Sequence, residues 1–511
     1  MRENDEPAKE AVLLAEIWQD VLRVDHVAPD DDFFSLGGDS LLAIKIVSAA
    51  QERGLPLTLL HLFRNPTPRG AASAGPVTRP AAPAALLAPE DLALVPEEAE
   101  TAYPATRLQL GLVYTSLATA GELYVDVVSR VVNLRLDASA LRTALDTMSA
   151  RHPALRTRFD LASFSEPVQV VLRSAPLPLT VAEHGTDDHE AVMSELAAPF
   201  DPETAPLMRV HAAAAGEAAF RLSYSFHHAV LDGWSESVFL RELVTIYAAL
   251  LRGGRLDLAT PAPFAEYVRL ERSALSDVES RRHFASFRGH QPATTRPLPG
   301  RAALRKIIGT VPSADAGGLA RRGADWGVPM KSLLLAACMV TVGSVWQEAD
   351  PTVGLAVSGR PELPGADLTL GLFLNHLPVR FETAGASWRT AAERALRAEN
   401  ELLPHRRFPY SEIRALAGGE TFEVSLNYMR FHSRDELLDA GLVAPEEDMR
   451  DHTDLPVRVE AFDDPRGLGL SLLVTVDVAR YGEDLPPRLL DGLLAALHEI
   501  ATDPAEEASA R

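Results

Sequence analysis

The chain is poor in cysteine, in long apolar runs and in positive charge, and each shortage excludes a class of protein. Cys338 is the only cysteine among 511 residues, so neither an intrachain disulfide nor a cage of cysteine thiolates around a metal can form. It lies in the apolar run Leu333–Val342, which predicts an inert, buried thiol. No uninterrupted apolar stretch reaches the roughly 20 residues that a membrane helix requires. The charged start Met1–Glu6 is followed by no apolar region of a signal peptide.

Acidic residues outnumber basic ones by 71 to 49, which gives a formal net charge of −22. This charge disfavours nucleic acid and anionic membranes as partners, and we expect a cytoplasmic protein that binds neither. A chain of 511 residues is too long for one compact core and suggests roughly three units. The acidic, alanine-rich end, residues 503–511, predicts a linker. We therefore expect a piece of a longer polypeptide, monomeric by itself.

Apolar patterning divides the chain into a small helical unit, residues 8–74, and a large α/β unit. In the first, residues at helical spacing predict a three- or four-helix bundle: Val12, Leu13, Ile17, Val21 and Leu22. Pro66–Gly70 places Pro and Gly where a fourth helix should start, so we expect that helix to be short or frayed. Residues 75–100 are rich in Pro and Ala, which predicts a stiff, extended linker.

From residue 101 onward, helical and strand patterns alternate, which predicts two α/β lobes, 101–270 and 271–502. The predicted helices are 138–151, 235–251, 330–346 and 388–403. The predicted strands are 220–226, 352–357, 372–381, 423–428 and 468–476.

The first motif with chemical content is Asp-Phe-Phe-Ser-Leu-Gly-Gly-Asp-Ser-Leu, residues 32–41. Ser40 follows Gly37, Gly38 and Asp39 at the predicted start of a helix. Two glycines permit a tight turn, and the N–H groups and positive dipole of a helix start favour an anion, such as a phosphodiester on Ser40. The simpler alternative is that Asp39 or Ser40 only caps the helix.

This decamer, with the closing Phe63-Arg-Asn-Pro66, resembles the attachment motif of peptidyl carrier domains in nonribosomal peptide synthetases. The resemblance implies that a phosphopantetheinyl transferase attaches 4′-phosphopantetheine to Ser40. It also implies that an upstream adenylation domain loads the thiol of that arm. Asp39 departs from the histidine that often stands there in carriers feeding a condensation domain directly, so the stereochemistry of the cargo stays open.

The second motif is His-His-Ala-Val-Leu-Asp-Gly, residues 227–233, between a predicted strand and a predicted helix. Histidine titrates near neutral pH and is the natural base for an amine that attacks a thioester. Asp232 can hold the loop through an ion pair, and Gly233 permits close approach of a substrate. Two core or metal-binding histidines are the alternative. Neighbouring side chains on a strand point to opposite faces, so we expect one histidine in a reaction chamber and one structural histidine.

This second motif resembles the signature of the condensation domain family, whose fold is related to chloramphenicol acetyltransferase. Four further stretches match family motifs in the right order, although Pro153 replaces the usual glutamate of the second motif: Tyr103–Gly111, Arg151–Phe159, Gly371–Arg380 and His405–Pro409. The resemblance implies that His228 is the base, whereas His227 and Asp232 are scaffolding. We expect Asp232 to pair with Arg360, with Arg156 as the other candidate. Asn375 either fixes the crossover between the lobes or is a structural amide.

Together the motifs predict a small all-α bundle followed by a two-lobed α/β domain that forms amide bonds. Donor acyl on Ser40 would pass to an amine on a downstream acceptor carrier domain, and ester formation stays open. An epimerisation domain is disfavoured because the motif continues Trp234-Ser235, the condensation form, rather than Val-Ser-Trp. The intact histidine motif disfavours a non-catalytic docking platform. The fused carrier disfavours a free-standing acyltransferase that uses coenzyme A.

Overall fold

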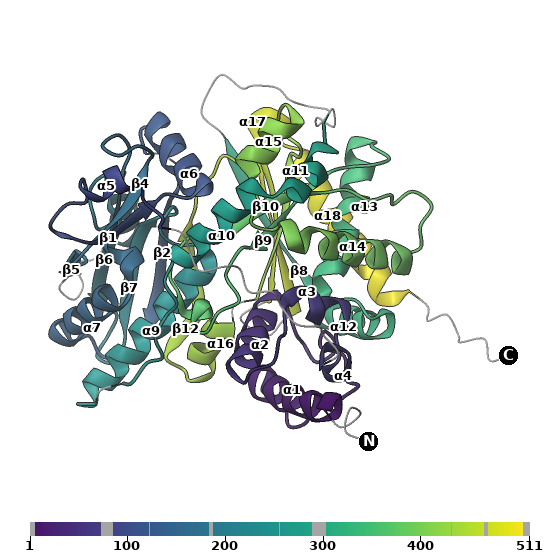
Figure 1. Cartoon of the computed structure of the whole chain (residues 1–511), viewed down its shortest axis with the longest axis horizontal. Helices are drawn as coiled ribbons and strands as arrows, with labels where there is room; N and C mark the ends of the chain where they lie inside the picture. Colours follow the sequence, from purple (N-terminus) through teal and green to yellow (C-terminus); the bar gives the residue numbers. More distant parts are fainter. Residues whose placement is uncertain are drawn as a thin grey trace.

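A computed structural model describes eight segments of the chain: residues 6–72, 85–121, 123–182, 188–254, 256–288, 303–430, 432–463 and 469–503. A small helical unit lies against the edge where two larger α/β lobes meet (Figure 1). The start of the predicted linker, residues 75–84, and nearly all of the predicted C-terminal linker lie outside the described residues.

The helical unit, residues 6–72, contains α1 (Glu6–Leu22), α2 (Ser40–Glu52), α3 (Leu59–Arg64) and α4 (Pro68–Ala72). Its core surrounds Trp18 and Phe33, which are fully buried with ring centroids 5.3 Å apart. A Cβ at Gly38 would lie 2.3 Å from the Phe33 ring, so only glycine fits there. The predicted bundle is confirmed, and α4 is short, as expected, with five residues.

The first lobe is built on a five-stranded sheet and a three-stranded sheet, in the orders β12-β2-β7-β6-β5 and β1-β4-β3. The strands are β1 (Ala99–Pro104), β2 (Val125–Val132), β3 (Thr157–Asp160), β4 (Val168–Leu172), β5 (Leu179–Ala182), β6 (Met208–Ala214), β7 (Phe220–His227) and β12 (Val443–Arg450). Its helices are α6 (Arg107–Ala118), α7 (Ala138–Arg151), α8 (His189–Leu196), α9 (Gly233–Leu251) and α10 (Ala265–Ser276). Strand β12 comes from the second half of the chain and pairs with β2, so one strand crosses between the lobes.

The second lobe has a six-stranded sheet in the order β10-β9-β11-β13-β14-β8. Its strands are β8 (Leu304–Pro312), β9 (Val353–Ser358), β10 (Leu374–Val379), β11 (Val424–Met429), β13 (Val457–Asp463) and β14 (Gly469–Asp477). Its helices are α11 (Val278–Ala285), α12 (Ser313–Trp326), α13 (Met330–Trp346), α14 (Trp388–Leu402), α15 (Tyr410–Ala417), α16 (His432–Asp439), α17 (Val478–Tyr481) and α18 (Leu485–Thr502). Cys338 lies fully buried in this core, where desolvation raises the pKa of its thiol to about 12, as expected for an inert thiol.

The later part of the predicted linker is not extended. Pro89–Leu92 forms helix α5, and Ala99 already belongs to strand β1. Asp91 is buried and its carboxylate accepts a hydrogen bond from the Ser165 backbone N–H at 2.9 Å. The extended conformation predicted for residues 85–100 is therefore wrong, because this segment finds polar and apolar partners on the first lobe.

Within the described ranges, no single helix is long and apolar enough to cross a membrane. One sharply bent pair, α12 with α13, passes that test only when the two are joined.

Candidate active site

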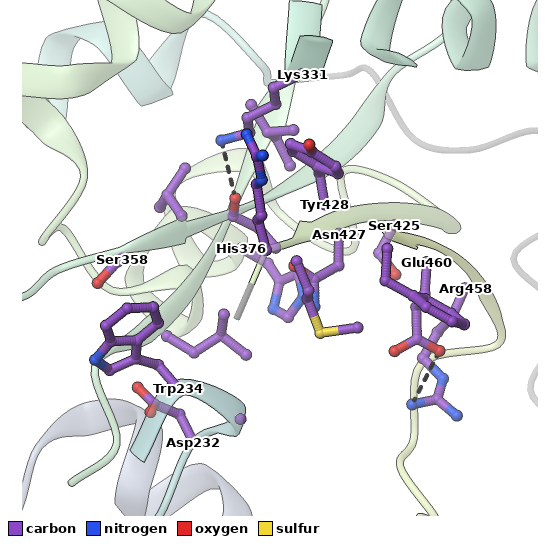
Figure 2. Close-up of a pocket in the computed structure, with 18 of the residues that line it drawn as sticks. Asp232, Trp234, Lys331, Ser358, His376, Ser425, Asn427, Tyr428, Arg458 and Glu460 are labelled. Carbon is purple, nitrogen blue, oxygen red and sulfur yellow. Dashed lines mark hydrogen bonds and ion pairs between the residues drawn. The ribbon is translucent and has the colours of Figure 1, made fainter. Parts of the chain in front are cut away.

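A cavity of about 1540 Å³ lies where the helical unit and the two lobes meet. It is lined by the turn Gly37–Asp39 of the helical unit, by His228 of the first lobe and by His376 and Arg458 of the second. Figure 2 shows part of this chamber, with side chains from β10, β11 and β13 on one side and Asp232 and Trp234 on another. All three parts of the chain therefore contribute to one space.

His228 follows the end of β7, and its backbone N–H donates to the Tyr124 carbonyl at 2.8 Å. Its side chain lines the chamber and is 18% exposed. The Nδ1 atom lies 2.8 Å from the Leu231 carbonyl oxygen. Because a carbonyl can only accept, Nδ1 must carry the proton, and this tautomer leaves Nε2 with the lone pair. The ring can therefore accept a proton at Nε2.

His227 has the opposite environment. Its side chain is fully buried, and its Nδ1 accepts a hydrogen bond from the Ala229 backbone N–H at 3.1 Å. Burial, with a smaller contribution from His228, lowers the pKa of His227 to about 4. The ring is therefore neutral at physiological pH and holds the turn after β7. The strand alternation correctly predicted one chamber-lining and one buried histidine.

Asp232 caps helix α9 and joins the two lobes. Its carboxylate accepts hydrogen bonds from the backbone N–H groups of Ser235, at 2.8 Å, and Phe373, at 3.0 Å. Arg360, itself buried, donates from Nη2 to Asp232 Oδ1 at 3.1 Å. The same guanidinium donates to three further acceptors: Ser235 Oγ and the carbonyls of Ala366 and Thr369. Gly233 begins α9 directly after this cap and lines the chamber.

The predicted pairing of Asp232 with Arg360 is confirmed, and the alternative, Arg156, lies elsewhere. Arg156 donates from Nη1 to Glu100 at 2.8 Å and from Nε to the Ser149 carbonyl at 2.7 Å. The Asp232–Arg360 pair thus connects the start of α9 in the first lobe to the segment after β9 in the second.

Asn375 and its neighbour His376 occupy opposite faces of β10. The Asn375 side chain is buried and donates to the carbonyls of Arg406, at 3.1 Å, and Phe408, at 2.8 Å. These bonds support the structural-amide alternative. His376 instead lines the chamber (Figure 2), where burial, with smaller contributions from His228 and Arg458, lowers its pKa to about 4. Strand periodicity places the two side chains on opposite faces but does not say which of them lines the chamber.

The helical unit contacts both lobes beside the chamber mainly through polar groups, and Leu403 of the second lobe packs against its apolar core. Lys45 Nζ lies 3.5 Å from Asp367 Oδ2 and 5.8 Å from the centroid of the Trp234 ring. Arg430 donates from Nη1 to the Gly37 carbonyl at 3.1 Å. An exposed pair, Arg23 with Glu436, lies at 2.5 Å. This contact places the glycine turn before Ser40 at the chamber.

The start of α2 fits an attached anionic arm. Asp39 Oδ1 accepts from the Leu42 N–H at 2.9 Å, so Asp39 caps the helix and Ser40 is its first residue. Gly37 has a φ of +88°, which a residue with a side chain rarely adopts, and the turn that it forms lines the chamber. A group attached at this helix start would therefore have space to enter the chamber.

Charged chamber residues were missed in the sequence. Asp126 lies on β2, and Lys306, Arg458 and Glu460 lie on β8 and β13. The signal for Asp126 was a carboxylate between Val125 and Val127, two apolar residues of that strand. The other three come from strands whose facing direction the sequence alone does not give.

The fold and the site together define a two-lobed acyltransferase-like domain preceded by a helical carrier. Residues 99–510 match the family model described as "Condensation domain", and residues 12–74 match "Phosphopantetheine attachment site". The chain therefore belongs to the condensation domain family and carries, before that domain, an attachment domain for 4′-phosphopantetheine.

Individual relatives agree with this assignment. The chain is 34% identical over 467 residues to AMB antimetabolite synthetase AmbE of Pseudomonas aeruginosa, an alignment that covers 85% of this chain and 22% of that protein. The condensation domain of monacolin K polyketide synthase MokA superposes with a TM-score of 0.67 at 19% identity, covering 80% of this chain and 99% of that one. The first condensation domain of the calcium-dependent antibiotic synthetase, in complex with a substrate analogue, superposes with a TM-score of 0.65 at 21% identity. That alignment covers 80% of this chain and 98% of the other. These two structures show the fold.

Proposed function

We propose that this didomain forms an amide bond between a donor acyl group delivered by residues 6–72 and an acceptor amine. The observation that carries the proposal is that the turn preceding Ser40 and the side chain of His228 line the same chamber. The carrier and the candidate base therefore need no large rearrangement to share a substrate.

Ser40 is the proposed attachment residue, at the start of α2 beside the capping Asp39. The 4′-phosphopantetheine arm supplies a thiol that holds the donor acyl group as a thioester. Arg430, which already contacts the Gly37 carbonyl, places positive charge beside this attachment turn.

His228 is the proposed base. As the acceptor nitrogen attacks the donor carbonyl carbon, one N–H proton passes to Nε2, the atom that the Leu231 contact leaves with a lone pair. The carbon–sulfur bond of the substrate then breaks, and the proton leaves with the departing sulfur. A positioned base contributes about 10²–10⁴-fold, and alignment of the two substrates contributes the rest. A hydroxyl acceptor would give an ester by the same steps.

Three partners follow from this reaction. A phosphopantetheinyl transferase must modify Ser40, an upstream adenylation domain must supply the donor, and a downstream carrier domain must present the acceptor. The support is the presence of both domain types in one chain and its likeness to a synthetase of which it spans 22%.

The proposal is tested by intact-protein mass spectrometry. The chain is incubated with a phosphopantetheinyl transferase and an aminoacyl-coenzyme A, and an aminoacylated carrier is then added as acceptor. We expect Ser40 to gain the loaded arm in the wild type and in His228→Ala, and Ser40→Ala to gain nothing. Dipeptide should form on the acceptor carrier only with the wild type.

Three results would contradict the proposal. Failure to load Ser40 would remove the delivery step. Loading without transfer to any carrier-bound acceptor would indicate a docking platform. Inversion of the donor α-carbon without transfer would instead indicate an epimerisation domain.

A further inference from the structure

Asp126 lies beside the proposed base on the neighbouring strand. It belongs to β2, whose antiparallel register with β7 pairs Val125 with His227, and the His228 N–H bonds to the Tyr124 carbonyl. This places the Asp126 side chain next to the His228 ring, with Oδ2 3.4 Å from Nδ1. Asp126 is 4% exposed, and its Oδ1 is buried without a hydrogen-bond partner.

Besides His228, three charged side chains of the chamber act on Asp126, namely Asp451, Arg458 and Lys306, and these three pair with one another or with Glu460. Asp451 forms ion pairs with Lys306 and with Arg458, and Arg458 lies 3.9 Å from Glu460. Figure 2 shows Arg458 and Glu460 side by side. These two cations therefore face two carboxylates of their own. Asp126 lies within ion-pair distance of neither cation, and the titratable group beside it is the imidazole of His228.

Burial of a carboxylate without a permanent cation is unfavourable, and here burial raises the pKa of Asp126 to about 6 while His228 opposes that rise. Asp126 is thus anionic at neutral pH. The anion gains a full counter-charge only when the His228 ring is protonated, which is the state that forms as the ring takes the amine proton.

We propose that Asp126 is a positioning residue for His228, holding Nδ1–H together with the Leu231 carbonyl and stabilising the imidazolium formed at proton transfer. The inference rests on the proposed function and assigns a second residue to it. Asp126 makes and breaks no covalent bond: the proton enters at Nε2 and leaves with the sulfur, and the carboxylate stays ionised. Asp126 therefore stabilises the transition state more than the ground state, because the positive charge on the His228 ring appears only as the proton is transferred.

The main test is histidine NMR on the holo didomain. In ¹³C-histidine-labelled protein, the ring signal of His228 is assigned as the one lost in His228→Ala. We expect this signal to titrate at lower pH in Asp126→Asn than in the wild type, because the imidazolium loses its neighbouring anion. The other titratable or charged groups that act on His228 or Asp126 are unchanged in this variant: His376, Lys306, Asp451 and Arg458. An unmoved titration would overturn the proposal, whether or not the wild type transfers acyl groups.

Kinetics give the second readout. Single-turnover transfer from Ser40 should slow about 10–100-fold in Asp126→Asn, and the acidic limb of its pH profile should move to lower pH. In the His228→Ala background the same substitution should change the rate by less than about twofold. An equal slowing in both backgrounds would show that Asp126 acts on folding or substrate, and would overturn the proposal.

The matched control is Asp454→Asn. Asp454 also lines the chamber, but its carboxylate accepts a hydrogen bond from the Tyr124 hydroxyl, which an amide oxygen can replace. We expect the His228 titration and the transfer rate to stay close to the wild type in this variant. A shift as large as that of Asp126→Asn would show that any chamber carboxylate suffices, and would overturn the specific role of Asp126.

Discussion

The molecule has two internal contacts of opposite character beside the same chamber. Where the lobes meet, Asp232 and Arg360 are buried and share their hydrogen bonds with backbone groups of both lobes. Where the helical unit meets the lobes, the ion pair Lys45–Asp367 is about a quarter exposed on each side, and Arg23–Glu436 is more exposed still. The lobe contact is therefore expected to be permanent, and the carrier contact to be weak.

The proposed function gives this difference a reason. The proposed base needs a fixed scaffold, since small displacements of a reacting group reduce rate strongly. A carrier must also reach the enzyme that loads it, so its contact has to open. Exposed ion pairs contribute about 0–1 kcal/mol each, whereas breaking a buried pair removes about 3–5 kcal/mol.

The largest expected effect breaks the lobe contact. Arg360→Met leaves Asp232 buried without its cation, and we expect the free energy of unfolding to fall by about 3–5 kcal/mol. Urea unfolding followed by circular dichroism measures it. The control is the same substitution in the half-exposed pair Arg380–Asp350, where Arg380→Met should lower stability by less than about 1 kcal/mol. Equal effects would mean that the Asp232–Arg360 pair does not hold the lobes.

The next effect concerns His227 behind the chamber. The pKa of His227 is about 4 in the folded protein and 6.5 in the unfolded chain. Its contribution to the free energy of unfolding is therefore complete above pH 6.5 and is lost as the pH falls toward 4, because only the unfolded chain binds the proton in that range. When the pH is lowered from 7 to 5, we expect this effect to reduce the free energy of unfolding of the wild type by about 2 kcal/mol. His227→Asn keeps an acceptor for the Ala229 N–H but does not titrate.

Urea unfolding of both proteins at several pH values isolates this residue, because all other titrating groups are common to the two. The stability difference between wild type and His227→Asn should narrow as the pH falls. A constant difference from pH 7 to pH 5 would contradict the buried, neutral state of His227.

The smallest expected effect sharpens the carrier side of the comparison. Lys45→Glu places like charges at the Asp367 contact and should slow transfer from Ser40 by no more than about fivefold, which corresponds to about 1 kcal/mol. The exchange Lys45→Glu with Asp367→Lys should restore the rate. A small soluble donor thioester, which bypasses the carrier, should react equally with the wild type and with both variants. Failure of the exchange to restore transfer would mean that this pair does not guide docking.

Much of the architecture could be predicted because it depends on local patterns. The helix 138–151 agrees with α7 at both ends, and the predicted helix 330–346 agrees with α13. The predicted strand 220–226 agrees with β7, because its apolar residues alternate with polar ones from Phe220 to Phe226. The motif residues at Ser40 and His228 were likewise identifiable from local sequence.

What could not be predicted depends on contacts between distant segments. Strand β12 is largely polar, with the sequence Val-Ala-Pro-Glu-Glu-Asp-Met-Arg, and becomes a strand because β2 of the other lobe is available to pair with it. Asp126 is beside His228 only through the β2–β7 register. Asn375 and His376 lie on opposite faces of β10. Only the packing of the lobes determines that Asn375 is buried against Phe408 while His376 lines the chamber.

The most direct test of the proposed reaction compares the two adjacent histidines in single-turnover transfer from loaded Ser40 to an aminoacylated carrier. We predict that His228→Ala slows transfer by about 10²–10⁴-fold, whereas His227→Asn stays within a few-fold of the wild type at pH 7.5 because it keeps the Ala229 bond. Wild-type rates in His228→Ala, or equal losses in both variants, would contradict a base at His228.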